Sequence, residues 1–555
     1  MTGDNELVFV PLGGLGEIGM NCALYGYGPP NARQWLMVDL GIGFADEDMP
    51  GVDLLMPDLD FIEKAKKNLV GVVITHAHED HIGALVELWP GLGATVYMTR
   101  FAAGLVEARR LGEPGAPEIP LKIVELGESV AIGPFVVEFI PVAHSIPESS
   151  ALAIRSPAGL IVHTADWKVD PTPVIGLPTD EARLRALGDE GVLALISDST
   201  NVLREGESPS ERDVAKTLAS LVAQAKGRVV VTTFASNVAR LRSAAEAGFA
   251  AGRQVCILGR AIERVVGVAR DCGLLDGLPP LLGADAFERL PRERILALAT
   301  GSQGEPRAAL ARMAGDDHPT AELSRGDTVI FSSRTIPGNE KAVGRIVNAF
   351  ARAGVEMVTD RTALVHVSGH PRRAEMAKMY AWVRPRIAVP AHGEPLHLTE
   401  HAEFARAQGV PEVLRAFNGD LVRLAPGQVY ASGKVSTGRR AKDGAILLPA
   451  DQETVRQRRR LGFAGIVSIA IALTPKGEMA GDPDVMIAGL PERTREGAAI
   501  DALIDDAIFE AFESLPPSKR RDAEVVSSAI ERAVRGSVNA VWGKKPQVHA
   551  LVVEV

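Results

Sequence analysis

The sequence predicts an α/β protein of several domains, and three observations lead to this prediction. The chain has 555 residues, of which 46% are hydrophobic and 23% charged, so it can bury several cores. This length indicates two to four domains. Its first forty residues contain three short strand-like segments joined by glycine-rich turns. From about residue 208 to 362, apolar strand segments instead alternate with helical segments, which is typical of a parallel sheet.

The opening glycines resemble a dinucleotide-binding fingerprint, but their context argues against that interpretation. In "LGGLGEIGM", Gly14, Gly16 and Gly19 have the spacing GxGxxG, and Asp39 follows twenty residues after Gly19. A dinucleotide site needs a helix directly after the glycines, because the N-terminus of that helix faces the pyrophosphate. Here the strand-like segment "NCALYGY" follows, and then "QWLMVDLG". We therefore predict a β-meander, which leaves Asp39 for another role.

Composition limits the class of protein without deciding its substrate. Cys22, Cys256 and Cys272 are too few and too scattered for a disulfide framework or a zinc ribbon, and fit a reducing compartment. No apolar run reaches the ~18 residues of a membrane helix, and the first residues lack a signal-peptide pattern, so we expect a cytoplasmic protein with no membrane partner. The net charge of -10 neither supports nor excludes nucleic acid, since a local basic groove remains compatible with it.

The alternating segments predict one domain inserted into another. "GRVVVTTF", "QVCILG", "RILALAT" and "TVIFSS" are each followed by a helical segment, which predicts a parallel, doubly wound sheet. The expected divisions are a first domain over 1–207, the insertion over 208–362, the resumed first domain with a linker over 363–450, and a small C-terminal α/β domain over 462–555. The C-terminal domain contains no metal-ligand or catalytic grouping, and subunit contact is its expected role.

The chemistry centres on "GVVITHAHEDHIGAL", residues 71 to 85. A β-rich run delivers His76 and His78 two residues apart, and Asp80 and His81 then open what we expect to be a helix running through "DHIGALVEL". Four ligand-type side chains within six positions suit a pair of metal ions. The alternative, a charged surface turn, is disfavoured because this loop holds three of the 12 histidines in the chain.

Further candidate ligands stand where strands are expected to end. His144 ends one apolar run, His163 and Asp166 end another, and His392 ends a third. Asp166 is the better ligand of its pair because a carboxylate can bridge two metals, whereas His163 fits a packed strand position. The predicted sets are His76, His78 and His144 on one ion, Asp80, His81 and His392 on the other, and Asp166 between them. Such nitrogen and oxygen ligands suit zinc, with manganese possible.

These motifs resemble known families over nearly the whole chain. "HAHEDH" with His144, Asp166 and His392 resembles the metallo-β-lactamase fold, in which Asp39 matches an acid beside the metals that would fix a ligand histidine. "SDSTN" around Asp198, "HVSGH" at 366–370 and "PAHGE" around His392 are similar to motifs A, B and C of the β-CASP nucleases. "GGLGEIGMN", "TFASN", "TGSQGEP" and "IPGNE" resemble the ribonuclease J family. The resemblance implies a metallo-β-lactamase αββα sandwich with an inserted β-CASP doubly wound α/β domain.

The resemblance also implies a function. Members of this family are metal-dependent RNases that degrade RNA from 5′ to 3′, prefer a 5′-monophosphate end, also cut internally, and act in mRNA decay and rRNA 5′ maturation. We expect two Zn²⁺ per subunit, with Mn²⁺ or Mg²⁺ possible, and a two-metal-activated hydroxide that attacks the scissile phosphodiester. Single-stranded RNA is the expected partner because His392 stands where DNA-directed relatives tend to have valine. Homodimers or homotetramers through the C-terminal domain are also expected.

The same resemblance assigns roles to individual residues, and some alternatives stay open. The expected catalytic residues are Asp80, Asp198 and His370, where Asp198 orients either His370 or a metal-bound water. The expected substrate-binding residues are Ser236, Asn237, His366, Val367, Ser368, Gly369 and His370. Helix capping explains Ser236 and Asn237 equally well, strand packing is an alternative for His366, and Ser302 and Gln303 are further candidates for holding phosphates or bases.

Two other interpretations of the function remain for testing. A hydrolase of small esters or thioesters would use the same fold but would not need the "HVSGH" loop or the insertion. A scaffold with a degenerate site would lack presumed ligands, and all seven are present.

Three charged segments are interpreted as solvated surface. The basic runs are Arg372 with Arg373 and "RQRRR" at 456–460, which could otherwise steer RNA, and the acidic loop is at 45–53, which could otherwise bind a cation.

Overall fold

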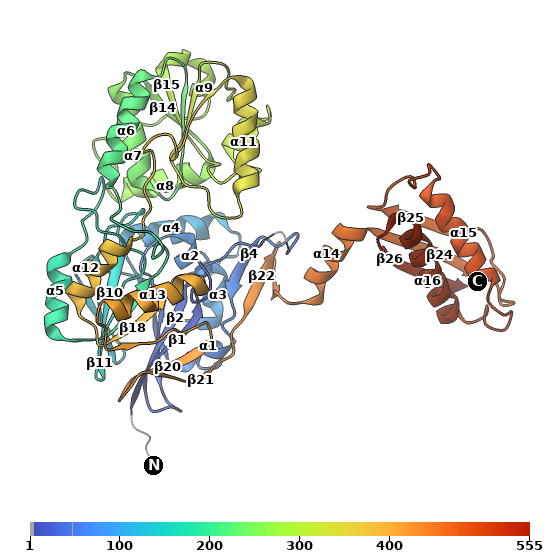
Figure 1. Cartoon of the computed structure of the whole chain (residues 1–555), viewed down its shortest axis with the longest axis horizontal. Coiled ribbons are helices and arrows are strands. Elements are labelled where there is room, and N and C mark those ends of the chain that lie inside the picture. The colour runs from blue at the N-terminus through green and yellow to red at the C-terminus, as the bar shows by residue number, and fades with distance from the viewer. Residues whose placement is uncertain (1–4, 47) are drawn as a thin grey trace. The chain divides into compact units, whose positions relative to one another are not determined.

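The computed structural model describes residues 5–46 and 48–555, which fold as two compact units (Figure 1). The first unit comprises residues 5–43 and 55–439. The second comprises residues 44–46, 48–54 and 440–555. The seven predicted metal ligands, from His76 to His392, all lie in the first unit.

Two large sheets form the centre of the first unit. One has the order β21-β20-β1-β2-β3-β5-β6-β7 and the other β19-β18-β12-β11-β10-β9-β8. Apolar side chains from both sheets, including Phe9, Tyr25 and Phe139, are fully buried in one shared core. The strands of the two sheets are β1 (Glu6–Gly13), β2 (Cys22–Gly28), β3 (Gln34–Val38), β5 (Leu69–Val73), β6 (Val96–Met98), β7 (Leu121–Ile123), β8 (Ser129–Ile132), β9 (Phe135–Pro141), β10 (Ser150–Ser156), β11 (Gly159–His163), β12 (Val192–Asp198), β18 (Ile387–Ala391), β19 (Glu412–Val413), β20 (Asp420–Ala425) and β21 (Tyr430–Lys434), while β4 (Leu54–Pro57) belongs to neither.

Helices cover this two-sheet sandwich. A second core joins the outer face of the β11 sheet to α5 and α12 through Leu184, Met379 and Leu195. The helices of this part are α1 (Asp60–Lys64), η1 (Lys66–Asn68), α2 (Glu79–Ile82), α3 (Leu85–Leu92), α4 (Arg100–Gly112), α5 (Glu181–Glu190), α12 (Arg373–Val383) and α13 (Pro395–Ala407). Layers of helix and sheet bury the apolar faces of both kinds of element.

The β-meander predicted for the first forty residues is confirmed. β1, β2 and β3 pair in antiparallel and sequential fashion, and Phe9 lies opposite Tyr25. Gly14, Gly16 and Gly19 all have positive φ angles, which glycine adopts without steric cost, and a strand follows them where a dinucleotide site would need a helix. β20 pairs with the free edge of β1, so residues 420–425 complete the sheet that the first residues began.

The insertion forms the parallel sheet that its sequence predicts. Its strands have the order β14-β15-β13-β16-β17, every pair is parallel, and helices lie on both faces (Figure 1). The elements are α6 (Glu211–Gln224), β13 (Val229–Thr232), α7 (Val238–Ala250), β14 (Gln254–Leu258), α8 (Arg260–Asp271), α9 (Ala286–Arg289), η2 (Arg292–Arg294), β15 (Ile295–Ala299), α10 (Ala309–Ala314), β16 (Thr328–Phe331), α11 (Glu340–Ala353) and β17 (Glu356–Val358). The expected limits of the domains along the chain stay predictions.

The single helix expected from Asp80 through Leu88 is wrong, because two helices occur there. α2 ends at Ile82 and α3 begins at Leu85. A continuous helix would pair the Ala84 N–H with the Asp80 carbonyl, but that carbonyl accepts the Asn21 N–H at 2.8 Å. The Ala84 N–H donates instead to Leu40 at 3.0 Å. A contact from the glycine-rich loop therefore interrupts the helix beside Asp80 and His81.

The second unit contains a three-stranded sheet and two long helices. β24 pairs with β25 in antiparallel and with β26 in parallel fashion, and one face of the sheet packs on α15 and α16. The elements are β22 (Arg439–Asp443), β23 (Ile446–Pro449), α14 (Glu453–Ala464), β24 (Ile466–Leu473), β25 (Asp484–Ala488), α15 (Ile500–Glu513), α16 (Ala523–Trp542) and β26 (Gln547–Glu554). Among the described residues, none of the helices combines the length and the apolar character needed to cross a membrane.

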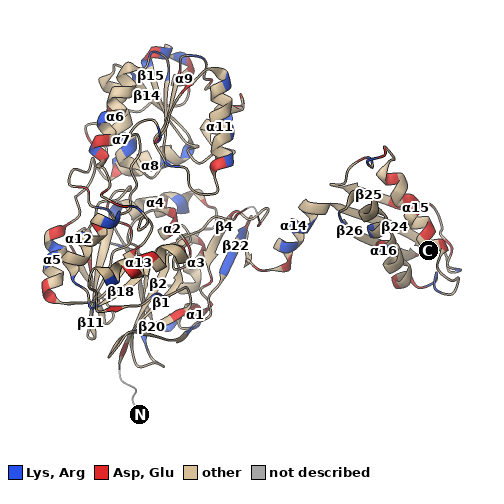
Figure 2. Cartoon of the chain, in the orientation of Figure 1, with Lys and Arg blue, Asp and Glu red and all other residues tan. Residues whose placement is uncertain are grey.

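Charge in the second unit is unevenly distributed along its elements, and Figure 2 shows acidic segments on α15 and basic segments on β22. The basic run "RQRRR" lies in α14, where Arg458 pairs with Asp443 and Arg459 with Asp48. These pairs fit the solvated surface expected for the run. The acidic loop at 45–53 includes Glu47, which lies outside the described residues, so its interpretation stays a prediction.

Candidate metal centre

Five of the seven predicted ligands follow the ends of strands in the two sheets, and the other two lie in the short helix after β5. His76 and His78 follow β5, while Asp80 and His81 lie in α2. His144, Asp166 and His392 follow β9, β11 and β18. β12 lies between β11 and β18 and is parallel to both, so the segments after these strands share one edge of the sheet. Segments far apart in the chain therefore meet at one place.

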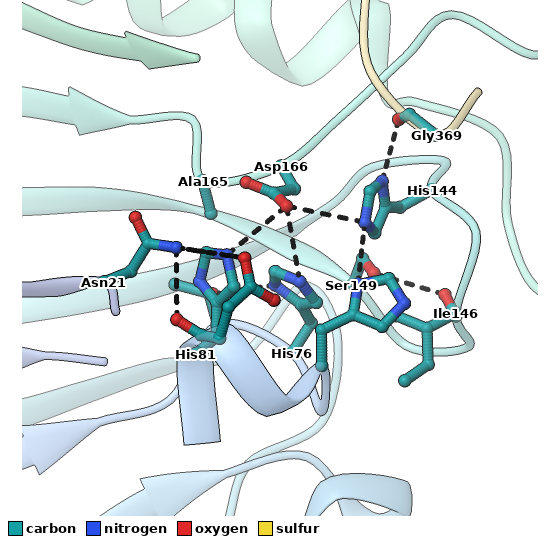
Figure 3. A network of polar contacts seen from close by, with 12 residues as sticks. Asn21, His76, His81, His144, Ile146, Ser149, Ala165, Asp166 and Gly369 are labelled. Atoms are coloured by element: carbon teal, nitrogen blue, oxygen red, sulfur yellow. Dashed lines mark hydrogen bonds and ion pairs between the residues drawn. The ribbon is translucent and has the colours of Figure 1, made fainter. Parts of the chain in front are cut away.

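Asp166 lies at the middle of this arrangement (Figure 3). Its Oδ2 atom is 3.3 Å from His81 Nε2, 3.6 Å from His144 Nε2 and 3.7 Å from His76 Nε2. Its Oδ1 atom is 3.1 Å from His392 Nδ1. The carboxylate, which is 2% exposed, thus faces histidines of both predicted sets. Its position is what a carboxylate shared by two cations requires.

The ligand atoms form two groups that have the composition expected for two metal ions. His76, His78, His144 and Asp166 form one group, and Asp80, His81, Asp166 and His392 form the other; within each, the ligand atoms lie within 4.8 Å of one another. A third group joins Asp166 and His392 with Asp198 and His370. Each of the first two groups offers imidazole nitrogens and carboxylate oxygens, a donor set that zinc accepts.

Two buried nitrogen atoms of the predicted ligands have no hydrogen bond, which indicates whether a metal ion would fit here. Among the described residues, His76 Nε2 and His392 Nε2 are buried and have no hydrogen-bond partner. Leaving polar atoms buried and unpaired is costly, and a cation coordinated by these nitrogens would remove that cost. The residues present therefore fit the metals that the fold implies.

Burial sets the protonation of three of these histidines. It lowers the pKa of His78 to about 4 and moves the pKa of His76 and of His144 well below the usual value. Neutral imidazoles are the form that binds metals, so near neutral pH these three are ready to coordinate. Burial also acts to lower the pKa of His81, but the carboxylates of Asp166, Asp80 and Asp39 outweigh this effect and raise the pKa.

Asp39 lies directly behind His81. Its Oδ2 atom is 2.7 Å from His81 Nδ1, and its Oδ1 atom accepts the Thr75 backbone N–H at 2.8 Å. The Thr75 hydroxyl also donates to Asp39 Oδ2 at 2.9 Å. A carboxylate in this position accepts the Nδ1–H of the histidine and directs its Nε2 toward Asp166.

The segment 366–370 closes the other side of the site. His370 Nδ1 is 2.8 Å from Asp198 Oδ2, and His370 is one of the two partners considered for Asp198. The Gly369 carbonyl is 2.7 Å from His144 Nδ1. Burial opposes protonation of His370, but Asp198 and Asp166 outweigh it and raise its pKa. With Nδ1 held by Asp198, Nε2 is the atom that His370 can present to a ligand.

Other predicted substrate residues have different surroundings. The Asn237 side chain is 3% exposed and accepts the Arg240 N–H at 2.9 Å as the N-cap of α7, which matches the capping alternative. Ser236 precedes it and is partly exposed, Val367 is buried, and burial moves the pKa of His366 well below its usual value. Gln303 donates to the Arg334 carbonyl at 2.9 Å and accepts from Ile336 N–H at 2.8 Å, so its amide is used within the protein.

Three residues that the sequence interpretation did not assign also contact the site. Asn21 Nδ2 donates to the Asp80 carbonyl at 3.1 Å and lies 3.0 Å from His81 Nε2. Thr200 Oγ1 is 3.1 Å from His392 Nδ1, and Asn201 donates to Ser368 Oγ at 2.9 Å. All three lie inside the motifs "GGLGEIGMN" and "SDSTN", so their place in those motifs was the available signal.

Comparison with known families divides the chain into four matched regions. Residues 17–225 match the metallo-beta-lactamase superfamily, and residues 226–350 match the ribonuclease J beta-CASP domain. Residues 354–413 match the Zn-dependent metallo-hydrolase RNA specificity domain, and residues 453–555 match the ribonuclease J C-terminal domain. The predicted αββα sandwich with an inserted β-CASP domain and a C-terminal α/β domain is confirmed.

Individual relatives agree with these matches. The chain is 52% identical to ribonuclease J of Sinorhizobium meliloti over 100% of this chain and 98% of that protein. It is 37% identical to ribonuclease J of Mycolicibacterium smegmatis over 98% and 96% of the two chains. A crystal structure of a protein of unknown function from Enterococcus faecalis shares the fold at 16% identity, with a TM-score of 0.53 over 75% of this chain and 100% of that one. The identity of 52% over the full length of both chains shows that this chain belongs to the ribonuclease J family.

Proposed function

We propose that the chain is a zinc-dependent ribonuclease of the cytoplasm that takes single-stranded RNA, degrades it from 5′-monophosphate ends in the 5′ to 3′ direction and also cuts it internally. Messenger RNA in decay and rRNA precursors in 5′ maturation are the proposed substrates. The observation that carries the proposal is the position of Asp166 between two groups of histidines, with His370 and Asp198 beside it. Hydrolysis of a phosphodiester needs neutralisation of the phosphate charge and a positioned hydrogen-bond donor, and the proposed site offers both.

Each group of residues has a distinct task in this proposal. His76, His78 and His144 would hold one zinc ion, Asp80, His81 and His392 the other, and Asp166 both. When bound, two such ions make a water molecule acidic enough to ionise near neutral pH and withdraw charge from a phosphate oxygen. Asp39 keeps the ring of His81 oriented, and Thr200 contacts the ring of His392.

The 366–370 segment would hold the scissile phosphate. Asp198 accepts the Nδ1–H of His370 and so directs Nε2 as a donor toward the non-bridging oxygen on which charge develops. Asn201 holds Ser368 Oγ and the His370 carbonyl, at 2.9 and 3.1 Å, which fixes the shape of the segment. Hydrolysis that releases the upstream 3′ oxygen leaves a 5′-phosphate on the downstream RNA, so each cut regenerates the preferred end.

End-labelled RNA tests this function directly. Full-length protein with zinc added is incubated with one RNA sequence that carries a 5′-triphosphate, a 5′-monophosphate or a 5′-hydroxyl, and products are sized over time. We expect mononucleotides to appear first from the monophosphorylated RNA and the activity to be lost with a chelator and restored by zinc. Hydrolysis of small esters or thioesters without cleavage of any RNA would instead favour the alternative hydrolase.

The second unit supports a proposal of self-association. The sheet face opposite α15 and α16 carries Met486, Leu551 and Val553 with exposed fractions of 60%, 66% and 45%. Apolar side chains gathered on one exposed face favour burial against another protein surface. We expect a homodimer or homotetramer whose mass, measured by light scattering after gel filtration, falls on Leu551→Asp. An unchanged mass for that variant would exclude this face as the contact.

A further inference from the structure

Arg240 is a fully buried arginine that the proposed chemistry does not use. It lies in the first turn of α7, within the inserted domain, and its side chain is 0% exposed. Its guanidinium donates from Nη2 to both carboxylate oxygens of Glu211, at 3.0 and 2.9 Å, and from Nη1 to the carbonyl of Ser332 at 2.8 Å. A guanidinium presents its N–H groups in a fixed plane, so partners on two sides define its position.

The same Nη1 atom reaches the segment that closes the metal centre. It donates to the Val365 carbonyl at 2.9 Å, and the Ser332 hydroxyl donates to that carbonyl at 2.6 Å. Val365 is itself buried and directly precedes the 366–370 segment. Two buried donors on one carbonyl therefore hold the amino end of this segment, while Asn201 and His144 contact its far end at Ser368 and Gly369.

Glu211, the carboxylate partner of Arg240, contacts the segment that follows Asp166. The Glu211 backbone N–H donates to Asp170 Oδ2 at 2.9 Å, and Lys168 Nζ lies 3.2 Å from the same oxygen. Lys168 also lies 3.9 Å from Glu211 Oε1. Lys168 and Asp170 follow Asp166 by two and four residues in the chain. The buried charges thus connect the segment after the shared carboxylate with the segment that carries His370.

We infer that Arg240 is a positioning residue that fixes the 366–370 segment against the metal centre through the Val365 carbonyl. This inference rests on the proposed function, which assigns the scissile phosphate to that segment. Reacting groups tolerate little displacement, and an error of about 1 Å lowers rates by about a hundredfold. Releasing the Val365 carbonyl is expected to move His370 while leaving the seven metal ligands in place.

Arg253 supplies a matched control in the same domain. It is also buried, at 4% exposure, and donates to the carbonyls of Gly227 and Ile295 at 2.7 and 3.1 Å. These residues lie at the amino ends of β13 and β15, whereas Ser332 follows the carboxyl end of β16. Arg253→Lys removes buried hydrogen bonds to backbone carbonyls, as Arg240→Lys does at Ser332 and Val365. Arg240→Lys also changes the pair with Glu211, and of the two arginines only Arg240 contacts the residue before the 366–370 segment.

The experiment compares Arg240→Lys, Ser332→Ala and Arg253→Lys in the full-length, zinc-loaded protein. Ser332→Ala removes one donor to Val365 without unbalancing a charge, which keeps the test valid if Arg240→Lys folds poorly. We expect both Arg240→Lys and Ser332→Ala to speed amide hydrogen exchange in peptides covering 366–370. Both variants should also lower kcat on monophosphorylated RNA, Arg240→Lys by about tenfold or more. KM should change less than kcat, and zinc content should not change. Arg253→Lys should leave exchange at 366–370 and kcat as in the wild type.

A double variant separates positioning from a general structural effect. If Arg240 acts through His370, adding Arg240→Lys to His370→Ala lowers kcat by no more than about threefold beyond His370→Ala alone. The inference would be overturned if the losses of kcat in the two single variants multiplied in the double variant. It would also be overturned if Arg240→Lys and Arg253→Lys had equal exchange rates at 366–370 and equal kcat. Hydrogen exchange does not need RNA, so wild-type protein without ribonuclease activity would refute the proposed function while the exchange comparison still decides the role of Arg240.

Discussion

The Gly369 carbonyl and His144 Nδ1 are 2.7 Å apart, so the segment proposed to hold the substrate also orients a proposed metal ligand. His144 Nε2 points the other way, toward His78 Nδ1 at 3.0 Å and Asp166 Oδ2 at 3.6 Å. One imidazole thus links the two functional parts of the site. A change at Gly369 itself is therefore expected to be felt at His144.

Gly369→Ala should weaken metal binding. A Cβ at this position would lie 2.6 Å from His144 Nδ1 and 2.8 Å from Ser145 Oγ, both far below contact distance. The ring of His144 must therefore shift, and we expect zinc affinity, measured by competition with a chromophoric chelator, to fall at least tenfold. Gly267→Ala in α8 is the control, because a Cβ there meets nothing within 4 Å and alanine is a better helix former. Wild-type zinc affinity in Gly369→Ala would contradict the link.

His78→Ala should abolish zinc binding at one position and RNA cleavage without unfolding the chain. Removing one half-buried imidazole opens a group of four ligands while the two-sheet core remains. Metal analysis and circular dichroism of the purified variant check the two halves of this expectation. His549→Ala, an exposed histidine of β26, is the control and should keep full metal content. Full zinc content in His78→Ala would remove that residue from the ligand set.

His370→Ala should lower turnover and spare the metals. Loss of one donor to a developing oxyanion costs about 10² to 10³ in kcat, and His370 is proposed to be such a donor. Zinc content should match that of the wild type, since His370 belongs to the third group, with Asp198, and is not among the seven predicted ligands. Single-turnover cleavage of monophosphorylated RNA measures the loss. A variant that keeps the full rate would show that our assignment is wrong.

Asp39→Ala should reduce zinc affinity although Asp39 is not a predicted ligand. The carboxylate accepts from His81 Nδ1 and from Thr75, and removing such a partner typically costs ten- to a hundredfold in metal affinity. Chelator competition gives the affinity. Asp60→Ala, at a carboxylate in α1 outside the three ligand groups, provides a comparison that should bind zinc normally. Equal affinities in the two variants would leave no orienting role for Asp39.

His401 should make the stability of the fold depend on pH. It is fully buried between Ser199 Oγ and Tyr380 OH, each at 2.8 Å, and burial lowers its pKa to about 3. Its folded-state pKa lies below the unfolded value of about 6.5, so its contribution is complete above pH 6.5 and declines as pH falls toward 3, by up to about 1.4 kcal/mol per unit. Melting temperatures of wild type and His401→Gln should differ most at pH 8 and converge below pH 6.5. A constant difference would contradict this.

The sequence predicted the parts of the site that are local and missed those that depend on distant contacts. His76, His78, Asp80 and His81 fall within six residues, so their chemistry is visible in one motif. His144, Asp166 and His392 could be placed because each follows an apolar strand, and the parallel register that sets Asp198 opposite Ala391 brings the ends of β12 and β18 together. The break after α2 was missed because it depends on Asn21, far away in the chain, taking the Asp80 carbonyl.

Side-chain partners were the least predictable feature. Gln303 stands in a loop where an amide is free to meet a substrate, yet it binds the backbone at Arg334 and Ile336. Arg240 follows a predicted helix cap, and nothing in its neighbourhood in the sequence indicates that it reaches Val365. Hydrogen bonds between residues so far apart in sequence follow from the packing of whole domains, which local periodicity does not encode.

The pairing of β20 with β1, together with the position of His392 after the insertion, has a consequence for synthesis on the ribosome. A nascent chain that has emerged only as far as the inserted domain has an open edge on its first sheet and lacks one of the seven ligands. If the proposed function holds, we expect tight zinc uptake, and with it hydrolysis of RNA, only after His392 and β20 have both left the exit tunnel. The order of elements along the chain would then keep the unfinished protein inert beside the very transcript that encodes it.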